Sequence, residues 1–193
     1  MYYRILARVG DLNLDPTIDD GATPLDIPIK RIIRHKEYDV QKYTNNIALL
    51  VLKNIVSFTA LIQPICLPQL PNIKNMDMGN SFSFIAGWGD YMFRGPSGTS
   101  LKEVQVPIIN LTDCINAYKK SRSVIDDRMI CAGEEGKDAC SGDIGGPLMW
   151  FKEKQFYLMG IVSYGYKCGE PNSPGVYTRV PYYLDWILER INS

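Results

Sequence analysis

The sequence lacks several features that would point to common classes of site or partner. It holds a single histidine, His35, and none of its five cysteines stands in a Cys-x-x-Cys pair, so a zinc site of the usual ligand spacing is excluded. Its 21 basic and 21 acidic residues balance to a net charge of zero, which gives no electrostatic attraction toward nucleic acid or an anionic membrane. We therefore expect neither as a partner.

Long hydrophobic runs are also missing. No apolar stretch approaches the roughly 20 residues that a membrane-spanning helix needs. The first ten residues alternate apolar and charged side chains like a strand, and they lack the apolar core of a signal peptide. We therefore expect the chain to begin inside a folded region, with the true start of the protein upstream of Met1.

What the chain does have is a globular composition with many turn residues. Of its 193 residues 46% are hydrophobic, and 16 glycines and 12 prolines interrupt short strand-like runs. Such spacing predicts an all-β sandwich or barrel. The clearest strand-like runs are residues 3–9, 27–33, 47–52, 82–86, 101–107, 157–163 and 176–180.

Two stretches have the pattern of a helix. Residues 111–119 open on Asn110 or Thr112, and either side chain could serve as the N-cap. Residues 182–191 follow a proline and place large side chains at helical spacing. Residues 69–80, rich in Pro, Asn and Met, are predicted to connect two halves. We therefore divide the chain into a first half and connector (1–80), a second half (81–180) and a terminal helix (181–193).

The pattern Gly142-Asp143-Ile144-Gly145-Gly146-Pro147 is the most demanding one in the chain. Its glycines allow a tight turn that points a backbone N–H at a reacting carbonyl, and its aspartate anchors that turn. Further segments of the same pattern stand in order along the chain. They are residues 64–68 (PICLP), 86–89 (AGWG), 129–133 (MICAG), 138–143 (DACSGD), 160–165 (GIVSYG) and 174–180 (PGVYTRV).

Together these segments resemble the trypsin-like serine proteases (peptidase family S1) over essentially the whole chain. Within that family the chain looks most like arthropod clip-domain proteases and venom serine-protease-like proteins. The resemblance implies an all-β fold: a double β-barrel whose N-terminal barrel is incomplete and whose C-terminal barrel is complete, followed by a C-terminal α-helix. Because strands of the first barrel are missing, we expect exposed strand edges and an exposed apolar interior there.

The positions of the catalytic triad depart from the family pattern. Ile144 occupies the serine position, and a hydrocarbon has no lone pair with which to attack a carbonyl. Asn46 occupies the aspartate position, and an uncharged amide cannot stabilise an imidazolium. The histidine of the family would lie upstream of Met1, whereas His35 matches a structural segment for which we expect a surface-loop side chain. The resemblance therefore implies a catalytically inactive homologue.

Much of the binding pattern of the family is retained. Asp138 matches the base of the primary pocket, where it would pair with an Arg or Lys side chain, and Lys167 would compete with such a ligand. Gly142 matches an oxyanion-hole position. Asp143 normally pairs with the N-terminal amine formed by activation cleavage, so we expect a buried, unpaired carboxylate here. The pocket walls match Ser163, Tyr164, Gly165 and Gly175. The alternative is that the pocket is inherited without being used.

The family pattern also assigns the cysteines. It pairs Cys114 with Cys131 and Cys140 with Cys168, and such disulfides imply an oxidising compartment. Cys66 commonly bridges, in the family, to a segment preceding the protease domain. We therefore expect Cys66 to be free here or joined to another polypeptide. The alternative from the residues alone is a set of buried free thiols in a cytosolic protein.

Two further features concern a cation and a glycan. The acidic loop with Asp11, Asp19 and Asp20 overlaps a calcium-binding loop of some relatives, although a solvated acidic turn is the commoner explanation. We expect no cofactor. Asn110-Leu111-Thr112 is a glycosylation sequon, which is used only if the chain enters the secretory route.

These observations predict a secreted, non-catalytic protease homologue that binds proteins. It would act as a cofactor or decoy in an extracellular immune, clotting or venom cascade, with active proteases or zymogens as partners. Two alternatives stand beside this prediction. One is a working endopeptidase of trypsin-like specificity, and the other is a truncated gene product without a function of its own.

Overall fold

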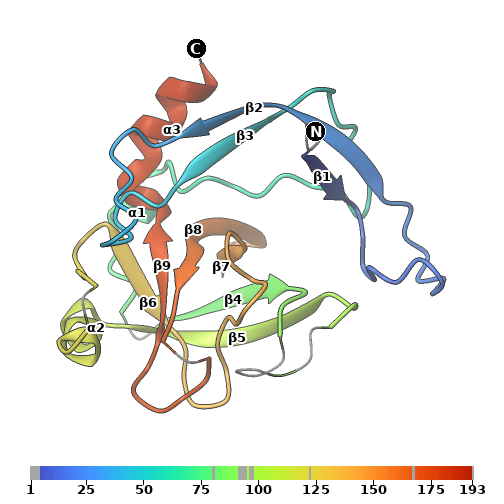
Figure 1. Cartoon of the computed structure of the whole chain (residues 1–193). Coiled ribbons are helices and arrows are strands. Elements are labelled where there is room, and N and C mark those ends of the chain that lie inside the picture. Colours follow the sequence, from blue (N-terminus) through green and yellow to red (C-terminus); the bar gives the residue numbers. More distant parts are fainter. Residues whose placement is uncertain are drawn as a thin grey trace.

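The structure is a computed structural model that describes residues 5–79, 81–90, 95, 98–121, 123–166 and 168–192. Figure 1 shows two unequal β units, an open sheet above and a closed barrel below, with the C-terminal helix rising beside the sheet. Most of the described regular structure is β-strand, as the spacing of turn residues predicts.

The first unit is a three-stranded antiparallel sheet in the order β1-β2-β3. Strand β1 (Leu6–Val9) pairs with the first half of β2 (Leu25–Arg34), and β3 (Ala48–Leu52) pairs with the second half. Strand β2 is rich in isoleucine, whose β-branched side chain favours extended backbone. The predicted strand over residues 3–9 thus begins at Leu6, and residues 1–4 lie outside the described part of the chain.

The second unit is a closed barrel with the strand order β4-β5-β6-β9-β8-β7. Closure pairs each of these strands on both sides and leaves no free edge. The expected complete C-terminal barrel is therefore confirmed. Its strands are β4 (Phe82–Gly87), β5 (Lys102–Ile109), β6 (Met129–Ala132), β7 (Pro147–Lys152), β8 (Gln155–Tyr164) and β9 (Gly175–Arg179).

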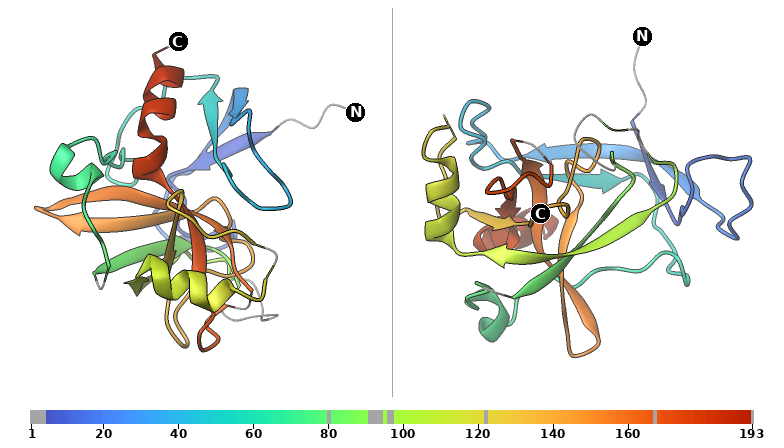
Figure 2. Two further views of the ribbon diagram at one scale, coloured as in Figure 1. Left: turned by 90° about the vertical axis from the view of Figure 1, so that its left-hand side faces the viewer. Right: turned by 90° about the horizontal axis from the view of Figure 1, so that it is seen from below.

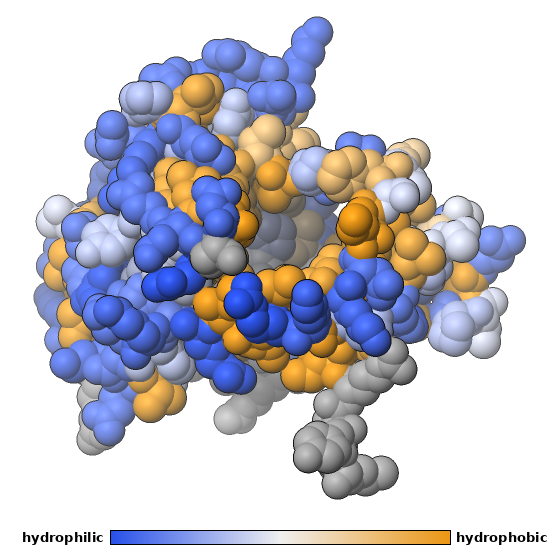
Figure 3. Space-filling model, turned by 90° about the horizontal axis from the view of Figure 1, so that it is seen from above, coloured by the Kyte–Doolittle hydropathy of each residue, from blue (hydrophilic) through white to orange (hydrophobic). Residues whose placement is uncertain are grey.

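The buried core lies almost wholly in the barrel. Its largest cluster includes Val106, Leu148 and Tyr177, which are fully buried. In the described chain ahead of residue 68, by contrast, Ile27 and Ile47 are the only buried hydrophobic side chains. Seen from above, hydrophobic side chains gather around a hollow in this face of the molecule (Figure 3). The fold is thus the expected double-barrel fold with an incomplete first barrel and an exposed apolar surface on it.

Short helices connect or follow the strands of the two units. A one-turn helix, α1 (Pro71–Lys74), interrupts the predicted connector, and α2 (Leu111–Tyr118) follows β5. The 3-10 turn η1 (Val180–Tyr183) leads into α3 (Leu184–Ile191), which stands next to the open sheet (Figure 2). No helix in the described residues is long and apolar enough to cross a membrane.

Candidate functional site

The loop that carries Ile144 leads from Cys140 into β7. Gly142 and Gly145 have φ angles of 95° and 88°, a left-handed backbone that favours glycine. The N–H of Gly145 donates to the carbonyl of Val162 at 2.9 Å, and the N–H of Val162 donates to the carbonyl of Gly146 at 2.9 Å. The loop is thereby fastened to β8, while the Ile144 side chain within it is exposed (68%).

Asp143 anchors the same loop from its other side. Its Oδ1 accepts a hydrogen bond from the N–H of Gly89 at 2.9 Å, and its Oδ2 accepts one from the N–H of Cys140 at 3.0 Å. A Cβ added at Gly87 would overlap the carboxylate, so the absence of a side chain there lets the two segments meet. The carboxylate is predicted to lack a charged partner, and in the structure backbone amides engage both of its oxygens.

The N–H groups of Gly142 and Ile144 donate no hydrogen bond to a backbone carbonyl in the described part of the chain, and the same holds for the N–H of Ser141. Amides of this kind can bind a carbonyl oxygen or an oxyanion. The resemblance indicated Gly142 alone. The Ile144 amide was not among the predicted site residues, because the family pattern marks this position by its side chain, although the main-chain donor is present whatever that side chain is.

Asn46 lies where the open sheet meets the barrel, two residues before β3. Its Nδ2 donates to the Oγ of Ser163 at 2.9 Å, and its carbonyl accepts a hydrogen bond from the Thr178 hydroxyl at 2.7 Å. Ser163 directly follows Val162, the residue to which the Ile144 loop is bonded. The structure therefore brings the two departures from the triad pattern to the same end of β8.

His35 packs against the C-terminal segment. Its ring centroid lies 5.7 Å from that of Tyr183 and 5.2 Å from that of Trp186. Its Nδ1 accepts a hydrogen bond from the N–H of Glu37 at 3.2 Å, and partial burial lowers the pKa of the imidazole. His35 thus lies in the loop that follows β2, as predicted, and it is half-buried there because α3 and the turn before it pack against the ring.

A cavity of about 160 Å³ opens beside Ile144, which forms part of its wall. Of the predicted wall residues, Tyr164, Gly165 and Gly175 line it. Ser163 is buried behind the wall instead, where its hydroxyl accepts the hydrogen bond from Asn46. Ser163 therefore links the sheet to the barrel rather than contacting the cavity directly.

Asp138 lies behind the part of the wall formed by Ala139 and Gly175. Its Oδ1 accepts a hydrogen bond from the N–H of Ala139 at 2.8 Å, and its Oδ2 accepts one from the N–H of Gly169 at 3.3 Å. A Cβ added at Gly175 would come within 2.5 Å of Oδ1, so the carboxylate is close to the cavity. Burial raises the pKa of Asp138 to about 6, against the opposing effect of the backbone hydrogen bonds. Lys167 lies outside the described residues.

Two tyrosines near the cavity were not among the predicted site residues. Tyr177 is fully buried and lines the cavity, and its hydroxyl has no hydrogen-bond partner in the described structure. It belongs to the PGVYTRV segment, so that segment could have indicated it. Tyr43 stacks on Tyr164 with 4.9 Å between ring centroids. No local pattern marks Tyr43, because its position depends on how a distant loop folds.

The cysteines form the two pairs that the resemblance implies. Disulfides join Cys114 to Cys131 and Cys140 to Cys168. Cys66 is free and partly buried, and its backbone pairs with β8. The Cys140–Cys168 disulfide borders the cavity beside Ile144 and holds two of its wall segments together.

The acidic loop is not assembled as a cation site. Asp11 Oδ2 lies 3.5 Å from the guanidinium of Arg8. Asp19 and Asp20 each accept a hydrogen bond from the backbone N–H two residues further on. Among the described residues there is no group of three or more His, Cys, Asp or Glu side chains that could hold a metal ion. These carboxylates therefore stabilise local turns.

Comparison with known proteins gives a consistent result. The family model described as Trypsin matches residues 12–187. The chain is 45% identical over 183 residues to the venom serine protease Bi-VSP of Bombus ignitus, covering 93% of this chain and 51% of that protein. It is 44% identical to the proclotting enzyme of Tachypleus tridentatus, covering 95% of this chain and 49% of that protein. It is 38% identical to the CLIP domain-containing serine protease B4 of Anopheles gambiae, covering 95% and 53%. The chain thus spans about half the length of these relatives.

Proposed function

Because this chain belongs to the trypsin family of serine proteases, we propose that it is a non-catalytic member that acts by binding proteins. The observation that carries the proposal is Ile144, whose hydrocarbon side chain stands where the family needs a nucleophilic serine. Asp143 and β8 still hold the loop in place. The substitution therefore removes the nucleophile without removing the loop that presented it.

Asn46 supports the same proposal. In this family a buried aspartate at the position orients the histidine base and stabilises its charge, and exchange of that aspartate for asparagine costs about 10⁴ in turnover. Here the Asn46 side chain donates to Ser163, as an amide can and a carboxylate cannot. Both changes affect one step, the transfer of the serine proton to the histidine. Restoring one of the two residues alone would therefore leave this step impaired by the other.

The cavity beside Ile144 supports a binding role. Above about pH 6 the Asp138 carboxylate is ionised and places a negative charge next to a cavity with aromatic and apolar walls. An arginine or lysine side chain presents the complementary chemistry, an apolar stem that ends in a positive charge. The exposed Ile144 side chain adds an apolar contact at the cavity. We therefore propose that a basic side chain of a protein partner occupies it.

The proposed setting is an extracellular proteolytic cascade. The relatives include a proclotting enzyme, a venom protease and a CLIP domain-containing protease. We propose that this protein is secreted and serves as a cofactor or decoy for active proteases or zymogens of such a cascade. Cys66, which is free and partly buried, is the residue through which an inter-chain disulfide would form.

Fluorophosphonate labelling tests the loss of catalysis. The full chain, folded under oxidising conditions, is incubated with a fluorophosphonate probe beside active trypsin and an Ile144→Ser variant. We expect no labelling of the wild-type chain under conditions that label trypsin completely, and at most weak labelling of the variant because Asn46 remains. Stoichiometric labelling of the wild-type chain, at any residue, would overturn the proposal.

A second experiment tests use of the cavity. A trypsin inhibitor that presents a lysine on its contact loop is immobilised, and binding of the wild-type chain is compared with that of Asp138→Asn. We expect saturable binding by the wild type and about tenfold weaker binding by the variant, which corresponds to roughly 1.4 kcal/mol of lost charge pairing. Equal binding by the two proteins would favour a cavity that is inherited without being used.

A further inference from the structure

Asn110 stands in the turn that leads from β5 into α2. Its backbone is extended, with φ −56° and ψ 143°, and its side chain makes no capping hydrogen bond. An asparagine at this position usually turns its side-chain oxygen toward the first amides of the helix. Asn110 is thus the N-cap residue of α2, one of the two predicted alternatives, but its side-chain amide takes no part in capping the helix. All three residues of the sequon are exposed.

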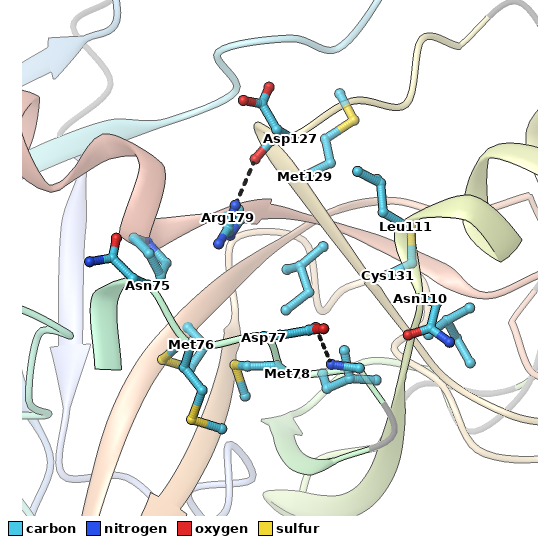
Figure 4. Close-up of a pocket in the computed structure, with 16 residues that line it drawn as sticks. Asn75, Met76, Asp77, Met78, Asn110, Leu111, Asp127, Met129, Cys131 and Arg179 are labelled. Carbon is cyan, nitrogen blue, oxygen red and sulfur yellow. Dashed lines mark hydrogen bonds between the residues drawn. The ribbon is translucent and has the colours of Figure 1, made fainter. Parts of the chain in front are cut away.

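The Asn110 side chain lies at the edge of a second cavity, of about 300 Å³ (Figure 4). Its Oδ1 lies against Gly79, where an added Cβ would overlap it. Figure 4 shows this oxygen turned toward the Asp77–Met78 segment and the side-chain nitrogen turned away from it. The structure therefore packs the oxygen of the amide against its neighbour and leaves the nitrogen accessible.

From this geometry we propose that Asn110 carries an N-linked glycan that projects from the exposed turn before α2, on the side away from the Asp77–Met78 segment. The Asn110 Nδ2 forms a bond to the anomeric carbon of the first N-acetylglucosamine and loses a proton. The bond from that carbon to the pyrophosphate of a lipid-linked oligosaccharide donor breaks, and the lipid pyrophosphate leaves. The modification rests on the proposed secretion, since the donor belongs to the secretory route.

A glycan at this position leaves the Ile144 site open. The cavity beside Asn110 and the cavity beside Ile144 share no lining residue. Modification of Asn110 therefore screens one face of the barrel from other proteins, and the face proposed for partner binding stays accessible.

The experiment uses the full chain, produced behind a secretory signal in mammalian cells. Thr112→Ser keeps the sequon and serves as the matched control for Thr112→Ala, which destroys it at the same exposed position. We expect the wild type and Thr112→Ser to show an intact-mass shift of one glycan that peptide N-glycosidase F removes. Thr112→Ala should have the mass of the bare polypeptide. Unmodified wild-type protein in both the secreted and the cell-retained fractions would overturn the proposal.

A footprinting measurement tests where the sugars lie. Hydroxyl-radical labelling of wild type and Thr112→Ala is compared at Leu111, beside the cavity (40% exposed), and at Tyr166, beside the Ile144 site (74% exposed). We expect a loss of labelling at Leu111 in the glycosylated protein and equal labelling at Tyr166. Equal labelling at Leu111 would contradict attachment of the glycan at this turn. Fluorophosphonate labelling of the same samples reports on the proposed loss of catalysis independently of both results.

Discussion

The open sheet and the closed barrel treat similar residues in different ways. Leu148 in the barrel is completely buried (0%), whereas Leu50 in the sheet is half exposed (54%). The barrel closes its hydrogen-bonding ladder and packs its own core, but the sheet has free edges and buries only a few side chains. What holds the sheet is its junction with the barrel, where Ile47 packs on Tyr183 and Ile187 and Asn46 bonds to Ser163. The barrel therefore has a core of its own, whereas the sheet is stabilised mainly through its contacts with the rest of the chain.

The largest expected effect comes from breaking the barrel core. Leu148→Ala deletes a fully buried side chain from β7, and we expect it to lower the free energy of unfolding by about 2–5 kcal/mol. Leu50→Ala is the matched substitution in the sheet, and we expect a change within about 0.5 kcal/mol because that side chain already contacts water. Urea unfolding followed by tryptophan fluorescence measures both. Similar losses of stability in Leu148→Ala and Leu50→Ala would contradict the conclusion that the barrel holds the buried core and the sheet does not.

A smaller effect is expected from the buried charge beside the barrel cavity. Burial raises the pKa of Asp138 from 3.8 to about 6, so the folded state keeps a proton that the unfolded chain releases. The contribution of this residue to stability is therefore full below about pH 4 and is lost as the pH rises through about 6. Asp138→Asn stays neutral and should not show that loss.

The measurement is the difference in unfolding free energy between wild type and Asp138→Asn at a series of pH values. We expect the wild type to lose on the order of 1–3 kcal/mol relative to the variant between about pH 4 and pH 7. Asp26 and Asp126, whose pKa values are lowered by arginine partners, titrate in both proteins and cancel. A difference that does not change with pH would show that Asp138 is solvated in the folded state.

At the junction we expect a smaller loss than at Leu148 or Asp138. Asn46→Ala removes the side-chain hydrogen bond to Ser163, and we expect a loss of about 1 kcal/mol together with faster amide hydrogen exchange in β3. Asn46→Asp is the matched control, because its carboxylate can accept a hydrogen bond from the same serine hydroxyl. Faster exchange in the barrel strands rather than in β3 would contradict the dependence of the sheet on the barrel.

The strands that local alternation marks could be predicted from the sequence. The runs at 82–86 and 157–163 lie inside β4 and β8. They could be recognised because turn residues bound them and one face of each is buried. The short strand β6 and the largely apolar β7 were not among the clearest runs, since neither alternates over enough residues to show a period of two. Helix α1, a single turn that begins at Pro71, is too short to show helical periodicity.

In the candidate site, too, a local sequence motif predicts some features, whereas others depend on contacts between distant segments of the chain. The Ile144 loop could be located because its glycines and aspartate stand at fixed spacing within one hexamer. The hydrogen bonds of Asp143 and the stacking of Tyr43 on Tyr164 could not, since each joins segments far apart in the chain. Ser163 was predicted to line the cavity, but in the structure it lies next to the cavity wall and bonds to Asn46. Only the packing of the strands decides which way such a side chain faces.

The two amides that hold Asp143 have a consequence for how this molecule changes over generations. The hydrogen bonds that hold the loop run from the amides of Gly89 and Cys140 to Asp143 and between the loop and Val162, and none of them involves the side chain at position 144. An isoleucine codon can lie a single base change from a serine codon, and the same is true of asparagine and aspartate. A single base change can therefore exchange a reactive for an unreactive side chain at position 144 without removing any of these hydrogen bonds.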